Sequence, residues 1–171
     1  GTGAAPVEFS NSLGMPLRDG LSFVHNSLRG FGLRREVKVI ASGKILSAFH
    51  MIRVMALGAD ACYAARAMML AVGCIQALQC NTNSCPTGVA TQDAVLMKGL
   101  DPISKRKRVS NYHQSTLEAF VEMLAASGLS SPSEIKKSHI LRRTSMNEVK
   151  SYEDIYPSIV EGSLLRSETY A

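Results

Sequence analysis

Three of the four cysteines in this 171-residue sequence lie within one short stretch, where their spacing points to metal chemistry. Cys74, Cys80 and Cys85 follow the pattern C-x5-C-x4-C, with Pro86 directly after the last one. A disulfide within the group would leave one thiol unpaired, and structural zinc ordinarily takes four ligands. A catalytic cysteine needs one thiol only and leaves the spacing unexplained. Iron–sulfur ligation accounts for the three cysteines and the proline. Three ligands predict a three-iron cluster, unless a fourth ligand comes from elsewhere.

Two other short segments have residues suited to binding an anion. In "ASGK" (41–44), Ser42 and Gly43 can turn the chain tightly and present backbone N–H groups to a ligand, and Ser42 is a suitable N-cap for a following helix. In "AARAMM" (64–69), small alanines leave space beside Arg66, which can bind phosphate through two parallel hydrogen bonds. The alternative is that Ser42 only caps a helix and Arg66 pairs with a carboxylate.

The elements that must position these residues follow from the hydrophobic periodicity. The sequence predicts alternating helices and strands with short connections, which is the pattern of parallel βα units. In such units the functional residues lie in the loops after the strands. We expect Cys74 to project from the last of the predicted helices and Cys80 to lie at its end. The predicted elements are a helix over 17–33, a strand over 36–41, a helix over 44–58 that ends at Gly58, a strand over 59–65 and a helix over 68–80.

The pattern changes after the cysteines. A long amphipathic helix is predicted over 104–128 and ends at Gly128. A short helix beginning near Ser131, a brief extended segment over 139–144 and a helical turn within 151–165 follow. We therefore expect α/β units over 1–100 and a mostly helical C-terminal extension over 101–171.

Composition narrows the class of protein. Hydrophobic residues make up 46% of the chain and charged residues 19%, which is typical of a globular protein. The net charge is +5 and the isoelectric point about 9.2, but the excess lies in two short clusters, 104–109 and 136–143, which we interpret as solvated faces rather than a nucleic-acid module. No apolar run is long enough for a membrane helix, and the sparse cysteines favour a reducing, cytoplasmic setting. The opening "GTGAAP" reads like the interior of a loop, so we expect a piece of a longer protein.

One stretch resembles a known family. The sequence "ASGKI…GADACYAARAMMLAVGCIQALQCNTNSCPTGVATQD" is similar to the FMN-binding, central domain of the glutamate synthase family, and "GTGAAP" resembles the end of that family's D-G-G-T-G-A-x-P motif. The resemblance implies that the βα units are the C-terminal part of a (β/α)8 TIM barrel with FMN at its C-terminal face. It also implies that a 3Fe-4S cluster is held by Cys74, Cys80 and Cys85.

The resemblance implies roles for further residues. Lys44 and Arg66 would hold the FMN phosphate or stabilise negative charge on the reduced flavin, while no catalytic side chain can be assigned. Ala41-Ser42-Gly43 replaces the Asp-Gly-Gly loop of the large glutamate synthases, so the chain looks closer to a shorter, glutamate-synthase-like branch. The residues implied at the cofactor are Gly1, Thr2 and Gly3 beside the flavin, and Ser42, Gly43, Lys44, Ala65 and Arg66 at its phosphate.

The reaction implied by the resemblance is the reductive formation of glutamate from 2-oxoglutarate and ammonia. The electron donor would be a subunit using reduced pyridine nucleotide, or ferredoxin. We expect no nucleic-acid or membrane partner, whereas a homo-oligomer is possible. Three alternatives stay open: an FMN oxidoreductase of this fold with another substrate, an inactive self-associating fragment without cofactor, and an anion- or RNA-binding module that uses Lys105 to Arg108.

Overall fold

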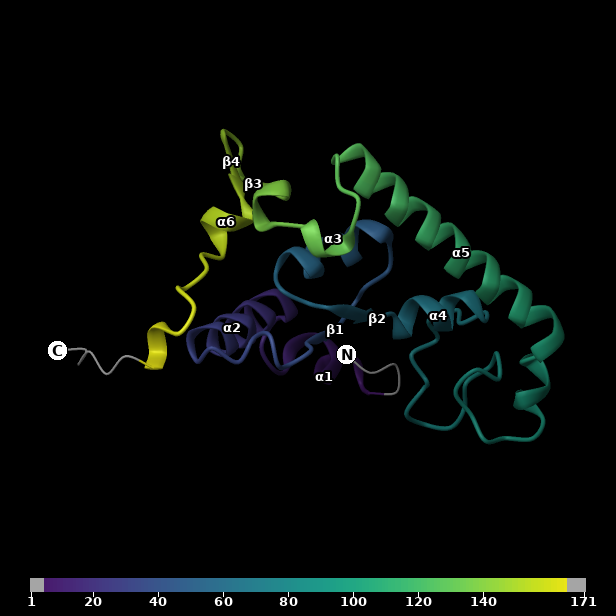
Figure 1. Cartoon of the computed structure of the whole chain (residues 1–171). Helices are drawn as coiled ribbons and strands as arrows, with labels where there is room; N and C mark the ends of the chain where they lie inside the picture. The colour runs from purple at the N-terminus through teal and green to yellow at the C-terminus, as the bar shows by residue number, and fades with distance from the viewer. Residues whose placement is uncertain (1–4, 166–171) are drawn as a thin grey trace. The chain divides into compact units, whose positions relative to one another are not determined.

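The computed structural model describes residues 5–165, and Figure 1 shows the course of the chain. The α-helices are α1 (Val7–Ser12), α2 (Leu17–Gly30), α3 (Ala48–Ala56), α4 (Ala65–Ala71), α5 (Pro102–Ala126) and α6 (Tyr152–Ile155). The strands are β1 (Ile40–Ser42), β2 (Ala61–Tyr63), β3 (Leu141–Ser145) and β4 (Glu148–Ser151). Short 3-10 helices are η1 (Leu96–Gly99), η2 (Pro132–Glu134), η3 (Lys137–His139) and η4 (Ser163–Leu165). In the described part, no helix has both the length and the apolar character that a membrane span requires.

Two small sheets are present. Strands β1 and β2 form a parallel pair, with α3 between them in the sequence. Strands β3 and β4 form an antiparallel hairpin, in which Arg142 lies opposite Lys150 and Arg143 opposite Val149. The fold is therefore mixed α/β with a parallel strand pair, which is compatible with part of a barrel.

The chain divides into two compact units. In its described residues, the first unit comprises 5–14, 42–48 and 63–122, and the second comprises 15–41, 49–62 and 123–165. The first unit thus holds both loops that follow the parallel strands, and also the cysteines at 74, 80 and 85.

In the first unit, α5 is hydrogen-bonded to the loop after β1. The hydroxyl of Tyr112 donates a hydrogen bond to the carbonyl oxygen of Leu46, with 2.9 Å between the oxygens. The helix begins at Pro102, earlier than predicted, because Asp101 accepts hydrogen bonds from the backbone N–H groups of Ile103 and Ser104 and proline suits the first helical position. The buried residues of this unit include Ile45, Ala48, Ala67, Cys85 and Phe120.

The second unit contains α2, most of α3 and the β3–β4 hairpin. Arg34 connects separate segments of this unit. Its guanidinium donates hydrogen bonds to the carbonyl of Gly58, the carboxylate of Asp60 and the imidazole of His25. The Asp60 carboxylate also accepts a hydrogen bond from the N–H of Val39, directly before β1. The buried residues of this unit include Leu21, Ala41, Ile52, Val54, Leu57, Leu124, Ile135, Ile140 and Tyr152.

Several predicted elements are confirmed. Helices α2 and α5 and strand β2 lie within or close to the predicted ranges, and Gly58 ends α3 in a left-handed conformation with φ +111°. The short helix after Ser131 is the 3-10 helix η2, with the Ser131 side chain as its N-cap. The extended segment near 139–144 forms strand β3.

The predicted helix over 68–80 is wrong, because α4 ends at Ala71. Gly73 has φ +109°, and its N–H donates to Leu70 while the N–H of Cys74 donates to Met69. This pair of bonds is the usual left-handed stop of a helix. Cys74 therefore does not project from the helix, and Cys80 does not lie at its end.

Two other predicted boundaries were also wrong. The strand begins at Ile40 rather than at 36, because the N–H groups of Glu36 and Val37 donate back to the carbonyl of Leu33. Helix α3 begins only at Ala48, since Lys44 has φ +52° and cannot start a right-handed helix. Ser42 is therefore the last residue of β1 and not a helix N-cap.

Candidate functional site

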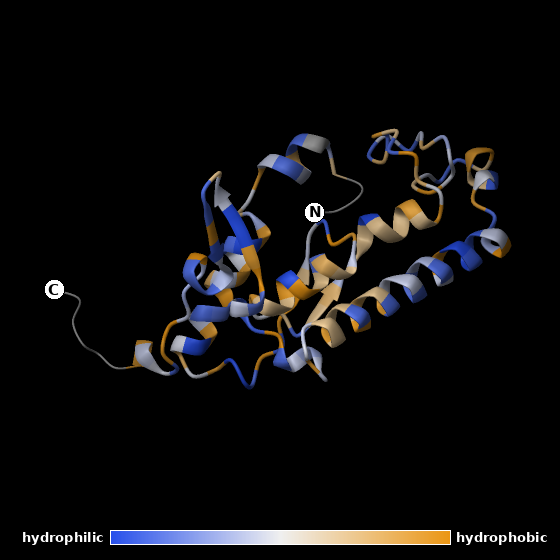
Figure 2. Ribbon diagram, turned by 90° about the horizontal axis from the view of Figure 1, so that it is seen from above, coloured by the Kyte–Doolittle hydropathy of each residue, from blue (hydrophilic) through white to orange (hydrophobic). Residues whose placement is uncertain are grey.

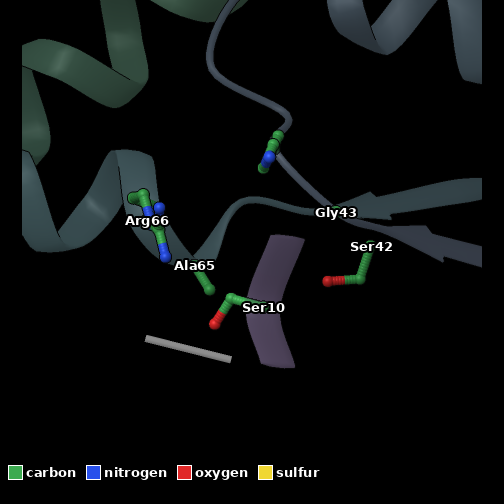
Figure 3. Close-up of a pocket in the computed structure, with 6 residues that line it drawn as sticks. Ser10, Ser42, Gly43, Ala65 and Arg66 are labelled. Atoms are coloured by element: carbon green, nitrogen blue, oxygen red, sulfur yellow. The ribbon is translucent and has the colours of Figure 1, made fainter. Parts of the chain in front are cut away.

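A small pocket forms where the two parallel strands end, and it lies entirely within the first unit. Figure 3 shows Ser42 and Gly43 on one side of it and Ala65 and Arg66 on the other. Ser10, from α1, lies between these two loops, and the hydroxyl of Ser42 points toward it. The lining residues are Ser10, Ser42, Gly43, Lys44, Ala65 and Arg66.

The backbone conformation brings the first loop into the pocket. Gly43 has φ +147° and Lys44 has φ +52°, so two consecutive residues with positive φ turn the chain out of β1. Such a turn is accessible to glycine and unfavourable for a lysine, so its presence points to a local constraint. On the second loop, β2 ends at Tyr63 and Arg66 follows in the first turn of α4.

The chemistry of the pocket suits an anion. Lys44 and Arg66 are cations, Ser10 and Ser42 have hydroxyl groups, and Ala65 and Gly43 leave the backbone accessible. None of the lining residues is a carboxylate. Among the described residues, Arg66 forms no salt bridge, so the alternative that it pairs with a carboxylate has no support.

The structure therefore brings together all of the described residues for which the resemblance implied a place at the phosphate. Ser10 was missed, because α1 shows no periodic pattern over its short length. Gly1, Thr2 and Gly3, implied beside the flavin, lie outside the described residues.

The segment with the cysteines, residues 72–100, is irregular and held by its own hydrogen bonds. The side-chain oxygen of Asn83 accepts from the N–H of Gln92 at 2.6 Å, and the hydroxyl of Thr91 donates to the Asn83 carbonyl at 2.6 Å. Gln76, Leu78 and Asn83 all have positive φ. Left-handed glutamine and leucine residues are uncommon and indicate a constrained loop.

Two of the cysteine sulfurs form hydrogen bonds in this loop. The N–H of Gln76 donates to Cys74 Sγ at 3.4 Å, and Cys85 Sγ lies 3.4 Å from the Thr87 hydroxyl. The hydrogen bond from Thr87, together with N–H groups of Ala90, Thr87 and Val89, lowers the pKa of the Cys85 thiol to about 7, although burial acts in the opposite direction. The loop thus favours a thiolate at Cys85, the form that binds metals.

The three thiols fit an iron–sulfur cluster in chemistry but not in arrangement. Cys74 and Cys80 are partly buried, Cys85 is buried, and all are free thiols. Donors to sulfur are what a protein supplies around such a cluster. Within residues 5–165, however, no three Cys, His, Asp or Glu side chains come together as a group that could hold a metal ion.

Comparison with known proteins gives a consistent answer. Residues 1–130 match the family described as "Conserved region in glutamate synthase". The chain is 39% identical over 160 residues to the glutamate synthase large subunit-like protein YerD of Bacillus subtilis, covering 94% of this chain and 30% of the relative. It is 38% identical over 149 residues to an archaeal glutamate synthase [NADPH] of Methanocaldococcus jannaschii, covering 86% of this chain and 29% of the relative. It is 33% identical over 135 residues to the glutamate synthase [NADPH] large chain of Azospirillum brasilense, covering 79% of this chain and 9% of the relative. The chain thus spans 30% or less of the length of these relatives.

Proposed function

The chain belongs to the glutamate synthase family, and from that premise we propose that it is part of an FMN- and iron–sulfur-dependent oxidoreductase. The proposed reaction is the reductive formation of glutamate from 2-oxoglutarate and ammonia, with electrons from reduced pyridine nucleotide or ferredoxin. Two relatives that are named as NADPH-dependent glutamate synthases support this reaction and its first donor. The proposed setting is the cytoplasm, since all four cysteines are free thiols.

The pocket at the ends of β1 and β2 is the observation on which the proposal mainly depends. In βα barrels, phosphate groups commonly bind in the loops that follow neighbouring strands. Here both loops come together around one cavity, and this cavity has two cations and no carboxylate. The parallel strand pair is what we expect of one part of a (β/α)8 barrel.

The polar and charged lining residues and Gly43 have specific roles in this proposal. Arg66 donates two parallel hydrogen bonds to phosphate oxygens, and Lys44 adds a second positive charge. Ser42 would donate a hydroxyl hydrogen bond, and Gly43 would let the backbone approach the phosphate closely. Ser10 would line the site, while its hydroxyl donates to the Ala5 carbonyl at 3.4 Å. These residues would thereby orient a bound flavin relative to the strand ends.

The cysteine segment has the second role in the proposal. Flavin supplies hydride transfer, and an iron–sulfur cluster supplies single electrons. Cys74, Cys80 and Cys85 would hold the 3Fe-4S cluster as thiolates. The hydrogen bonds to the sulfurs of Cys74 and Cys85 support that role, because such bonds stabilise the charge on a ligating sulfur.

A comparison of FMN with riboflavin tests the pocket, because riboflavin lacks only the phosphate. We expect flavin fluorescence to report that FMN binds at least tenfold more tightly than riboflavin. Arg66→Ala should weaken FMN binding about tenfold to a hundredfold, since a charge-assisted hydrogen bond contributes about 1.5–3 kcal/mol, and should leave riboflavin binding unchanged. Lys98→Ala, which removes an exposed cation outside the pocket, is the control. Equal binding of the two flavins would refute the assignment of the phosphate site.

Anaerobic reconstitution with iron and sulfide tests the thiols separately. We expect Cys74, Cys80 and Cys85 to become protected from alkylation, while Cys62 keeps its reactivity as an internal control. Unchanged alkylation of all four cysteines would remove the cluster from the proposal. Oxidation of the electron donor that depends on both 2-oxoglutarate and ammonia would then identify the reaction. Turnover with another keto acid only would instead favour an FMN oxidoreductase of different specificity, a possibility that the name "large subunit-like" of one relative keeps open.

A further inference from the structure

A second cavity in the first unit is a long open groove between α4 and the amino-terminal half of α5. Its apolar lining comes from Met68, Val72, Leu100, Pro102 and Val109, and none of these side chains is buried. The groove has a volume of about 510 Å³, which is room for several aliphatic side chains. The other lining residues are Lys105, Arg106, Ser110 and His113.

The residues from α5 lie on one face of the helix. Pro102, Lys105, Arg106, Val109, Ser110 and His113 are separated by three residues and one residue in alternation, the spacing of a single helical face. From 102 to 113 this face is about 16 Å long at 1.5 Å per residue. A groove of this length along a helix matches three turns of another helix packed beside it.

The edge of the groove is positively charged. Lys105 and Arg106 lie on it, and its lining contains no carboxylate. Within the described part of the chain, neither cation forms a salt bridge. Gly73 lies against Lys105, because a Cβ built on this glycine would be 3.1 Å from the Lys105 Nζ atom. In Figure 2 the amino-terminal half of α5, the longest helix, is largely hydrophilic.

We propose that this α4–α5 groove is a docking site for an acidic amphipathic helix of a partner protein. The apolar stripe of the partner would fill the floor formed by Met68, Val72 and Val109. Asp or Glu residues beside that stripe would pair with Lys105 and Arg106, which fixes both the charge and the orientation of the helix. This proposal uses none of the residues of the flavin pocket and none of the cysteines, although Val72 and Leu100 are the two ends of the cysteine segment.

Nucleic acid fits the groove less well. Single-stranded nucleic acids bind through aromatic stacking combined with charge, and the groove has no Phe, Tyr or Trp. A phosphate backbone would also leave the aliphatic floor uncovered. Lys105 and Arg106, two of the four cations in the basic cluster over 104–109, are therefore better explained as the charged edge of a peptide groove.

Designed peptides test the proposal without knowledge of the natural partner. The probe is a fluorescein-labelled 18-residue helix with leucines at helical spacing and glutamates beside them. One comparison peptide has lysine in place of each glutamate, and another has the acidic sequence scrambled. We expect fluorescence anisotropy to show binding of the acidic helix, at least tenfold weaker binding of the lysine helix and no binding of the scrambled peptide, because each of several charge pairs contributes up to about 1 kcal/mol.

Two charge reversals on neighbouring residues locate the site. Arg106→Glu reverses a charge at the groove and should weaken binding of the acidic helix about threefold to tenfold. Lys107→Glu makes the same change on an exposed residue outside the groove and should change binding less than twofold. Val109→Asp should abolish binding, and circular dichroism checks that each variant is folded.

Three outcomes would overturn the proposal. The first is equal binding of the acidic and lysine helices, or binding of neither. The second is an equal effect of Arg106→Glu and Lys107→Glu, which would mean attraction to the overall charge of α5. The third is tighter binding of a labelled 20-base-pair RNA duplex than of the acidic helix, which would assign the cluster to nucleic acid. If Val109→Asp fails to fold, the comparison of Arg106→Glu with Lys107→Glu still shows whether the acidic helix binds in the groove.

Discussion

Substitution of Gly58 by alanine should destabilise the second unit far more than the same change at another helix end. Gly58 follows α3 with φ +111°, and its N–H donates to Met55 while the N–H of Ala59 donates to Val54. A Cβ at this position would lie 2.0 Å from His25 Nδ1 and 2.4 Å from His25 Cγ. The ring cannot move aside freely, because Arg34 Nε donates a hydrogen bond to His25 Nδ1 at 3.1 Å.

The expected loss is the sum of separate effects. A left-handed conformation costs alanine about 1 kcal/mol more than glycine. Relief of the overlap with the ring adds about 1–3 kcal/mol of packing strain, and loss of the bond between His25 and Arg34 adds about 1 kcal/mol. Gly58→Ala should therefore lower the free energy of unfolding by about 3–5 kcal/mol.

Gly128 is a matched control in the same unit. It follows α5 with φ +70°, and its N–H and that of Leu129 form the same pair of bonds, to Ala125 and Leu124. A Cβ on Gly128 would meet nothing within 4 Å. Gly128→Ala should therefore lose only the conformational term of about 1 kcal/mol.

Urea denaturation followed by circular dichroism measures both variants. Addition of His25→Ala to Gly58→Ala should restore about 1–3 kcal/mol relative to the sum of the single changes, because it removes the ring that the new methyl group meets. Equal losses for Gly58→Ala and Gly128→Ala, or strict additivity with His25→Ala, would refute the reasoning.

Two other predictions concern titratable side chains of the second unit. Burial, followed by the nearby charges of Arg34, Lys137 and Arg29, lowers the pKa of His25 to about 4. The folded state then binds fewer protons than the unfolded state between pH 6.5 and about 4, so stability should fall as the pH is lowered through this window, and His25→Gln should reduce that fall in pH-dependent urea titrations. The buried amine of Lys137 donates to the Tyr156 carbonyl and the Ser158 hydroxyl, each at 2.7 Å. Lys137→Met should cost about 1–3 kcal/mol in thermal unfolding, because two acceptors lose their donor; a loss no larger than that of the exposed control Lys107→Met would contradict it.

Prediction from sequence succeeded where local signals and burial agreed. Helix α5 has a long apolar stripe and a glycine stop, and Gly58 ends α3 as its position after an apolar helix suggested. Prediction failed where a helix stop signal lay inside a longer apolar stretch. Gly73 is the same kind of stop, but the apolar run that continues through Cys74 to Leu78 concealed it and extended the predicted helix to 80.

The meeting of the loops after β1 and β2 in one pocket was predictable from the topology. Parallel strands place the residues after their carboxyl ends at one edge of the sheet, so Ser42 and Arg66 could be expected to lie close together although they are far apart in the sequence. Ser10 could not be found in this way, since α1 precedes the strands and approaches the loops only through tertiary packing. The family, by contrast, was predicted from residue identities alone and is confirmed.

For the three thiols, the sequence spacing and the fold of the chain give different information. Spacing in the sequence reports the ligands that a bound cluster would require, whereas the fold of the chain reports only the interactions that protein atoms make with each other. A thiol is a weak hydrogen-bonding group, so the polypeptide has little to gain from bringing three of them together. The stronger local bonds of Asn83 and Thr91 shape the loop instead. Metal–thiolate bonds would supply the missing free energy, and ligand binding of this kind is coupled to folding of the site. The cysteine segment is therefore the part of the chain whose conformation should change most on reconstitution, while the pocket at the ends of β1 and β2 should already be formed.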